Sequence, residues 1–166
     1  MATLSRTGPL KVKLRTFYVV RHAKAGSREK WSGDDRKRPL TPKGIKQAQD
    51  LVDVLVLYPV ASIFSSPYLR CVQTVQPLAK RLRLKVEQSV SLAEGHGVEG
   101  LREFFSEKDL DHAVLCTHGD VVWELVEYLV KRKIVRAGEG GFDKGSTWII
   151  HVGDEDPVKA RYLPAP

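Results

Sequence analysis

The chain has 166 residues, of which 42% are hydrophobic, and it carries a formal net charge of +7. This length suffices for one domain with a sizeable core, and we predict a single domain over residues 15–166 behind a flexible basic lead-in, residues 1–14. No apolar run reaches the ~20 residues of a membrane-spanning helix and the N-terminus does not resemble a secretory signal, so we expect a cytoplasmic protein.

The positive charge is concentrated near the N-terminus. Residues 1–46 hold 13 Lys and Arg against three acids, whereas the remainder holds 14 against 17. Such a segment can attract anionic substrates. No nucleic-acid-binding motif accompanies it, so we do not predict a nucleic-acid partner.

The two cysteines, Cys71 and Cys116, lie in apolar segments, which favours buried reduced thiols. The sequence has no Cys/His zinc pattern, so we expect no metal or cofactor.

Strand and helix patterns alternate along the chain. A polar loop over residues 23–40 follows the first strand, and Thr41-Pro42 and Ser66-Pro67 are typical of helix starts, with a capping side chain before a proline. Pro77 should kink or interrupt the second helix. The predicted strands cover about 15–20, 60–65, 84–87, 113–117, 146–152 and 158–162, and the predicted helices about 41–56, 66–82, 98–107 and 119–132.

This alternation predicts an α/β fold. Helices between strands imply a mainly parallel central sheet covered on both faces, which is a three-layer α/β/α sandwich. The two late strands, separated by residues 153–157, suit a hairpin and imply an antiparallel edge.

Two strands end in histidines. Arg21-His22 follows the first apolar strand, and His118 follows the strand at 113–117 directly before a helix. Ligands of α/β sheets bind outside the carboxyl ends of the strands, and helix N-termini favour anions. The sequence therefore predicts a phosphate site here, although the residues alone leave open which histidine would attack.

These motifs resemble those of the histidine phosphatase superfamily, the phosphoglycerate-mutase-like proteins of branch 1. Arg21-His22-Ala23 is similar to the Arg-His-Gly signature, with the alanine also found in SixA-like members. The resemblance continues at residues 65–74 and 117–119 and so covers most of the chain. It implies the same three-layer fold.

The resemblance also implies the role of each residue. His22 would be the nucleophile that carries a transient phosphoryl group, because a neutral imidazole nitrogen has a free lone pair near neutral pH. Arg21, Arg70 and His118 would hold the phosphate. Glu94 would exchange protons with the leaving group and water, with Glu99, Asp35 and Asp120 as alternatives.

Two further stretches, residues 33–41 and 144–148, resemble the histidine phosphatase domains that some bacteria fuse behind a Nudix hydrolase domain. This resemblance places Arg36 and Lys144 near the pocket mouth as substrate-binding residues. The chain has no Nudix motif of its own, and whether a Nudix partner exists stays open, as does the oligomeric state.

Three functions are compatible with these residues. The first is a metal-independent phosphatase that hydrolyses phosphomonoesters or phosphohistidine through a covalent phosphohistidine on His22. The second is a phosphomutase, which the short chain does not favour, and the third is a binding module without catalysis, which the complete set of predicted site residues does not favour. The substrate could be a phosphorylated small molecule, a phosphohistidine protein as for SixA, or a nucleotide, for which Trp31 would be available to stack on the base.

Overall fold

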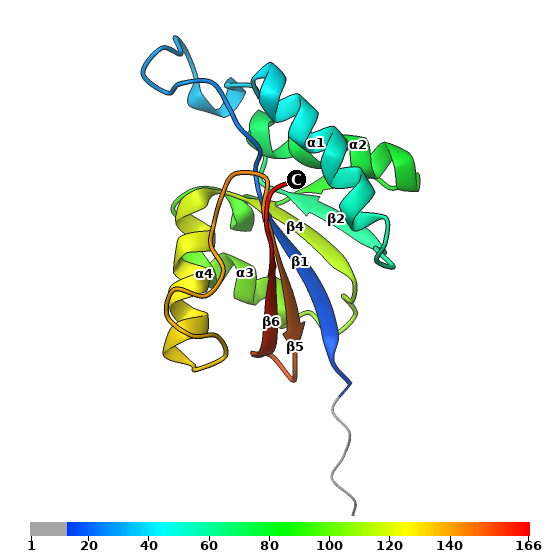
Figure 1. Ribbon diagram of the computed structural model, residues 1–166. Coiled ribbons are helices and arrows are strands. Elements are labelled where there is room, and N and C mark those ends of the chain that lie inside the picture. The colour runs from blue at the N-terminus through cyan, green and yellow to red at the C-terminus, as the bar shows by residue number, and fades with distance from the viewer. Residues whose placement is uncertain (1–12) are drawn as a thin grey trace, which may run out of the picture.

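The computed structural model describes residues 13–166, so the predicted flexible lead-in lies almost wholly outside the described residues. A six-stranded sheet in the order β3-β2-β4-β1-β5-β6 lies between two pairs of helices (Figure 1). The strands are β1 Arg15–Arg21, β2 Ser62–Ser65, β3 Val86–Gln88, β4 Ala113–Thr117, β5 Thr147–Val152 and β6 Pro157–Leu163. The helices are α1 Pro42–Leu55, α2 Leu69–Leu82, α3 Gly97–Phe105 and α4 Gly119–Lys131, with short 3-10 turns η1 Asp35–Lys37 and η2 Val90–Leu92.

The sheet is mainly parallel, as predicted. Strands β3, β2, β4 and β1 run parallel to one another, whereas β5 pairs antiparallel with both β1 and β6. The late hairpin therefore forms one edge of the sheet. The predicted three-layer fold with an antiparallel edge is confirmed.

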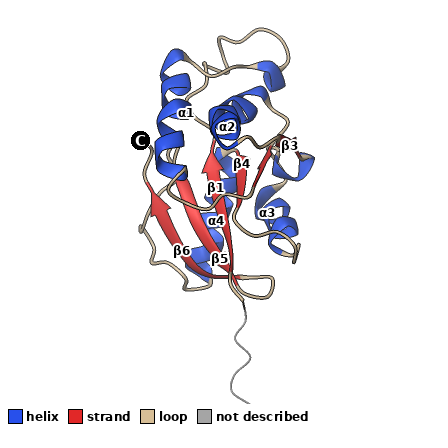
Figure 2. Cartoon of the chain, turned by 90° about the vertical axis from the view of Figure 1, so that its right-hand side faces the viewer, coloured by secondary structure: helices blue, strands red, loops and turns tan. Residues whose placement is uncertain are grey.

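Alternate residues of β1 fill the two cores. Phe17 and Val19 pack with α3 and α4, whereas Tyr18 and Val20 pack with α1 and α2, and all four side chains are buried. Successive strand residues point to opposite faces, so a central strand covered on both sides must be apolar throughout. Figure 2 shows the strands between these helix layers. The free thiols of Cys71 and Cys116 are buried, in agreement with the sequence.

Helix α1 begins where the sequence indicates, and it supports the segment after His22. The Thr41 hydroxyl accepts a hydrogen bond from the Gly44 amide and donates one to the Lys24 carbonyl. Gly44 packs directly against that carbonyl, because a Cβ at this position would overlap the Lys24 oxygen. The start of α1 thereby fixes the backbone two residues beyond His22.

The predicted start of α2 at Ser66 and the predicted interruption at Pro77 are wrong. The helix begins at Leu69 rather than at Ser66, and it continues through Pro77 to Leu82 without interruption. Val75, Leu78 and Ala79 are fully buried around the proline, and burial of each large apolar side chain contributes about 1.5–3 kcal/mol. Core packing therefore outweighs the cost of a proline inside the helix, about 3 kcal/mol.

No helix among residues 13–166 has both the length and the apolar character needed to span a lipid bilayer.

We expect Gly44→Ala to lower the free energy of unfolding by about 1–3 kcal/mol, because the new methyl group would push the Lys24 backbone away from α1. Gly26→Ala is a matched control, since a Cβ there meets no atom within 4 Å. Urea unfolding of both variants measures the difference. Equal stabilities would contradict this close packing of α1 on the site.

Candidate active site

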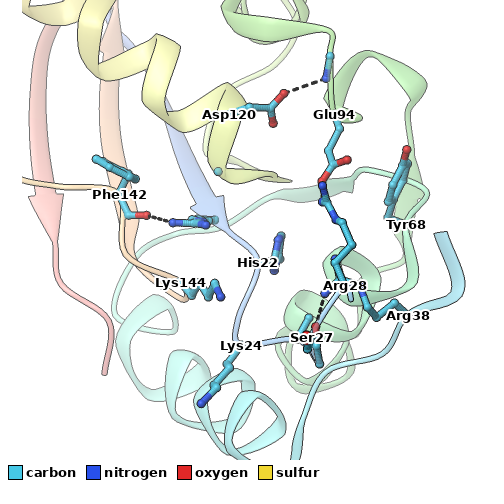
Figure 3. Close-up of a pocket in the computed structure, with 15 residues that line it drawn as sticks. His22, Lys24, Ser27, Arg28, Arg38, Tyr68, Glu94, Asp120, Phe142 and Lys144 are labelled. Carbon is cyan, nitrogen blue, oxygen red and sulfur yellow. Dashed lines mark hydrogen bonds and ion pairs between the residues drawn. The ribbon is translucent and has the colours of Figure 1, made fainter. Parts of the chain in front are cut away.

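The carboxyl ends of β1, β2 and β4 converge on one site. The His22 amide donates to the Thr117 carbonyl at 3.0 Å, and the Ser66 amide donates to the Cys116 carbonyl at 2.9 Å. These bonds continue the strand pairing past the strand ends and hold His22 and Ser66 around the end of β4. A cavity of about 950 Å³ opens here, lined by residues that include Arg21, His22 and Glu94 (Figure 3).

His22 is buried and has one free ring nitrogen. Its Nδ1–H donates to the Ala23 carbonyl at 2.7 Å, which leaves the lone pair on Nε2. Burial, together with the positive charges of Arg70 and Arg21 and the neighbouring His118, lowers the pKa of His22 to about 3 despite the Ala23 hydrogen bond. The imidazole is therefore neutral and nucleophilic across the physiological pH range.

His118 lies beside His22, with ring centroids 5.5 Å apart. Its Nε2 is 2.8 Å from the Ser66 hydroxyl, and its Nδ1 is 3.5 Å from Glu94 Oε1. Ser66, expected to cap α2, instead positions His118. The Ser66 hydroxyl also accepts a hydrogen bond from the Tyr68 amide at 3.3 Å, and the helix begins one residue later, at Leu69.

Arg70 is fully buried and is held by two carboxylates. Its guanidinium donates to Glu94 Oε1 at 2.8 Å, to Asp35 Oδ2 at 3.1 Å and to the Asp35 carbonyl at 2.9 Å. Burial alone would raise the pKa of Asp35, but the hydrogen bond from Arg38 and the charges of Arg70, Arg38 and Arg28 lower it below the ordinary value. Both carboxylates thus balance a dense group of cations beside His22.

Arg21 lies at the start of α4. It donates to the Phe142 carbonyl at 2.7 Å, and a Cβ at Gly119 would lie 2.6 Å from its guanidinium. Glycine at the first position of α4 therefore allows Arg21 to reach the helix N-terminus. The Nε atoms of Arg21 and Arg70 are buried without a hydrogen-bond partner among residues 13–166. Such groups are costly to bury unless a ligand satisfies them.

The other residues singled out from the sequence differ in position. Lys144 lines the cavity, and burial together with the charges of Arg21, Lys24 and Arg38 lowers its pKa. Arg36 does not line it, because its guanidinium binds Asp34 within the same loop.

The alternative acids also differ. Asp120 lines the cavity and accepts a hydrogen bond from the Gly95 amide at 2.9 Å. Glu99 does not line the cavity and instead pairs with Arg102 at 3.0 Å. Asp35 binds Arg38 and Arg70, so its role in the structure is to balance charge.

Sequence reasoning did not single out three basic residues and one tyrosine of the cavity wall, Lys24, Arg28, Arg38 and Tyr68. Arg28 binds Glu94 at 2.8 Å, Arg38 binds Asp35 at 2.8 Å, and Lys24 lies near Lys144. The Tyr68 ring packs 4.9 Å from the Arg70 guanidinium carbon and edge-on to His118. Tyr68 belongs to the 65–74 motif, which could have indicated it, but no periodic signal distinguishes the basic residues of the loop.

Across residues 13–166, no cluster of three or more His, Cys, Asp or Glu side chains has an arrangement that could hold a metal ion.

Comparison with known proteins defines the class. The sequence model of the histidine phosphatase superfamily (branch 1) matches residues 17–104, which contain Arg21, His22, Arg70 and Glu94. The chain therefore belongs to the histidine phosphatase superfamily, as its motifs predict.

Individual relatives agree with this assignment. An 8-oxo-(d)GTP phosphatase of Mycolicibacterium smegmatis is 36% identical over 160 residues, which are 93% of this chain and 50% of the relative. The chain thus spans about half the length of that protein. SixA from Agrobacterium tumefaciens has the same fold, with a TM-score of 0.74 at 19% identity over 92% of this chain and 99% of SixA. A tungstate complex of the protein histidine phosphatase SixA gives a TM-score of 0.67 at 19% identity over 90% of this chain and 94% of that chain.

The low pKa of His22 predicts a pH dependence of stability. The unfolded chain binds a proton at this histidine below pH 6.5, whereas the folded protein binds it only near pH 3. Stability should therefore fall as the pH drops from 6.5 towards 3. From pH 7 to pH 5 we expect the wild type to lose about 2 kcal/mol more than His22→Gln, measured by urea unfolding. Equal losses would mean that His22 is not buried in its neutral form.

Proposed function

We propose that this protein is a phosphatase that transfers a phosphoryl group from its substrate to His22 and then to water. The observation that carries the proposal is the state of His22: a neutral ring whose Nδ1–H binds the Ala23 carbonyl and whose Nε2 is free, with Arg21, Arg70 and His118 as neighbours. Membership of the histidine phosphatase superfamily supports it.

In the first step, the Nε2 lone pair of His22 attacks phosphorus, and the bond from phosphorus to the leaving oxygen breaks. Arg21, Arg70 and His118 would bind the three nonbridging oxygens, where guanidinium and imidazole donors stabilise the charge of the transition state. The buried and unpartnered Nε atoms of both arginines are consistent with an anionic ligand.

Glu94 is the best placed of the candidate acids. It lines the cavity, contacts Arg70 at 2.8 Å and lies 3.5 Å from His118. In this proposal it protonates the leaving oxygen and later takes a proton from the water that attacks the phosphohistidine.

The substrate is a phosphorylated small molecule or a phosphohistidine protein. A nucleotide is favoured among the small molecules by the relative that is named an 8-oxo-(d)GTP phosphatase. The proposal includes a cytoplasmic location and, as an alternative function, a nucleotide phosphatase that acts together with a Nudix hydrolase.

The nucleophile is tested by replacing it. We expect His22→Ala to lose nearly all turnover and all covalent label from a ³²P-labelled substrate, while His96→Ala, an exposed loop histidine near the cavity, retains both. Rapid quenching in alkaline detergent preserves phosphohistidine, which acid then releases. Retention of more than a few percent of turnover by His22→Ala would refute the assignment, and transfer of label to an acceptor instead of inorganic phosphate would indicate a phosphomutase.

The acid is tested with leaving groups of different basicity. We expect Glu94→Gln to slow hydrolysis of an alkyl phosphate by about 10²–10⁴-fold, because an alkoxide must be protonated as it leaves. An activated aryl phosphate needs little help and should lose far less. Equal losses in kcat/KM would make Glu94 a positioning residue, and no loss on either substrate would move the role to Asp120, Asp35 or solvent.

Positive charge at the site comes from arginine and lysine side chains. We therefore expect EDTA to leave phosphate release unchanged after prolonged dialysis. Loss of activity that a divalent ion restores would contradict this part of the proposal.

A further inference from the structure

A second cavity, of about 960 Å³, adjoins the catalytic one. Phe142 lines both, and Trp123 lines the second. Trp123 follows Gly119 by one turn of α4, a rise of about 6 Å, and Gly119 lines the catalytic cavity. The two cavities are thus neighbours along the first turns of one helix.

Trp123 and Phe142 form an exposed aromatic pair. Trp123 is 49% exposed and Phe142 37%, and their ring centroids lie 5.2 Å apart at 85°. Aromatic rings supply large, rigid contact area to a ligand at a low cost in conformational entropy. An exposed Trp-Phe pair beside an active site is therefore suited to a flat, apolar part of a substrate.

Arg21 fixes this pair relative to the phosphate site. Its guanidinium donates to the Phe142 carbonyl at 2.7 Å, and its Cζ lies 5.9 Å from the centre of the Phe142 ring. The Gly145 amide also donates to the Arg21 carbonyl, so the loop that carries Phe142 is tied to the end of β1 at two points. A ligand could use both sites without rearranging the chain between them.

The two cavities differ in charge. Five cationic residues line the catalytic cavity together with two acids: Arg21, Lys24, Arg28, Arg38 and Lys144, with Glu94 and Asp120. Four acidic residues line the second cavity together with one lysine: Glu99, Glu124, Glu127 and Glu139, with Lys131. This difference would direct phosphates to the first cavity and keep them out of the second.

Two lysines of the catalytic cavity have no acidic partner in the described part of the chain. Arg28 and Arg38 pair with Glu94 and Asp35. Lys24 and Lys144, in contrast, form no such pair within residues 13–166, and Figure 3 shows Lys144 on the same side of His22 as Phe142, with Lys24 below it. A second anionic group next to the transferred phosphoryl group would find its partners there.

From this arrangement we propose that the substrate is a nucleoside diphosphate or triphosphate whose base stacks on the Trp123–Phe142 pair. The proposal rests on the proposed function and names its substrate class. His22 Nε2 forms a bond to the terminal phosphorus as the bridging P–O bond breaks, and the electron pair leaves with the shortened nucleotide. Water then attacks that phosphorus, the N–P bond breaks, its electron pair returns to His22, and inorganic phosphate is released as Glu94 and solvent take the protons.

The test compares two substrates with the same reacting group, guanosine diphosphate and methyl diphosphate, which has no ring. Removing an aromatic stacking partner typically weakens binding by roughly 5- to 150-fold. We expect Trp123→Ala to lower kcat/KM for guanosine diphosphate within this range, mainly through KM, and to leave methyl diphosphate unchanged. Trp123→Phe should restore most of the loss. Trp31→Ala is the matched control: the sequence leaves Trp31 available to stack on a base, but in the structure this side chain, 37% exposed, lines neither cavity.

Binding is measured separately from turnover in the His22→Ala variant. Guanosine diphosphate should quench the tryptophan fluorescence of this variant, because its base would stack on Trp123. Equal effects of Trp123→Ala on both substrates, or no effect on either, would overturn the proposed stacking of the base on Trp123 and Phe142. A wild type that hydrolyses methyl diphosphate or a phosphohistidine protein as well as the nucleotide would overturn it too, while leaving the phosphatase proposal intact. Absence of phosphate release and of label on His22 with every substrate would count against the phosphatase itself.

Discussion

Charge balance around Arg70 constrains the whole site. This guanidinium is fully buried, and such a charge is tolerated only when partners compensate for the lost hydration. Asp35 and Glu94 supply that compensation from two separate loops and also bind Arg28 and Arg38. The polar loop after His22, the segment after β3 and the start of α2 are therefore held together by one network. In the proposed reaction a phosphoryl group would use these same donors, so the carboxylates would give up some of their contacts with Arg70 when substrate binds.

Much of the fold and the central part of the site could be predicted from local sequence signals. An apolar run such as 113–117 is typical of a strand buried on both faces, and the helical spacing after Gly119 places His118 at a helix start. Since parallel strands deliver their carboxyl ends to one edge, His22 and His118 were expected to meet, and their rings lie 5.5 Å apart. The family resemblance added Arg70 and Glu94, whose contacts with each other no local pattern implies.

The remaining errors arise where tertiary contacts override local preference. Ser66 has the sequence context of a helix cap, but its hydroxyl is hydrogen-bonded to His118 Nε2 and the helix begins only at Leu69. Arg36 has the same side chain as Arg28 and Arg38, and only the fold of the loop, with Asp34 binding Arg36, determines which of them face the cavity. Phe142 and Trp123 are separated by most of α4 and a glycine-rich loop, so their contact could not be inferred without the structure.

The position of β1 in the sheet has a consequence for how the chain folds. Its only strand partners among the described residues are β4 and β5, which lie about 100 and 130 residues further along the chain. Closing such long loops is slow, because chain entropy is lost before any contact is gained. His22 is synthesised before β4 and β5, so its surroundings form only after these strands have arrived.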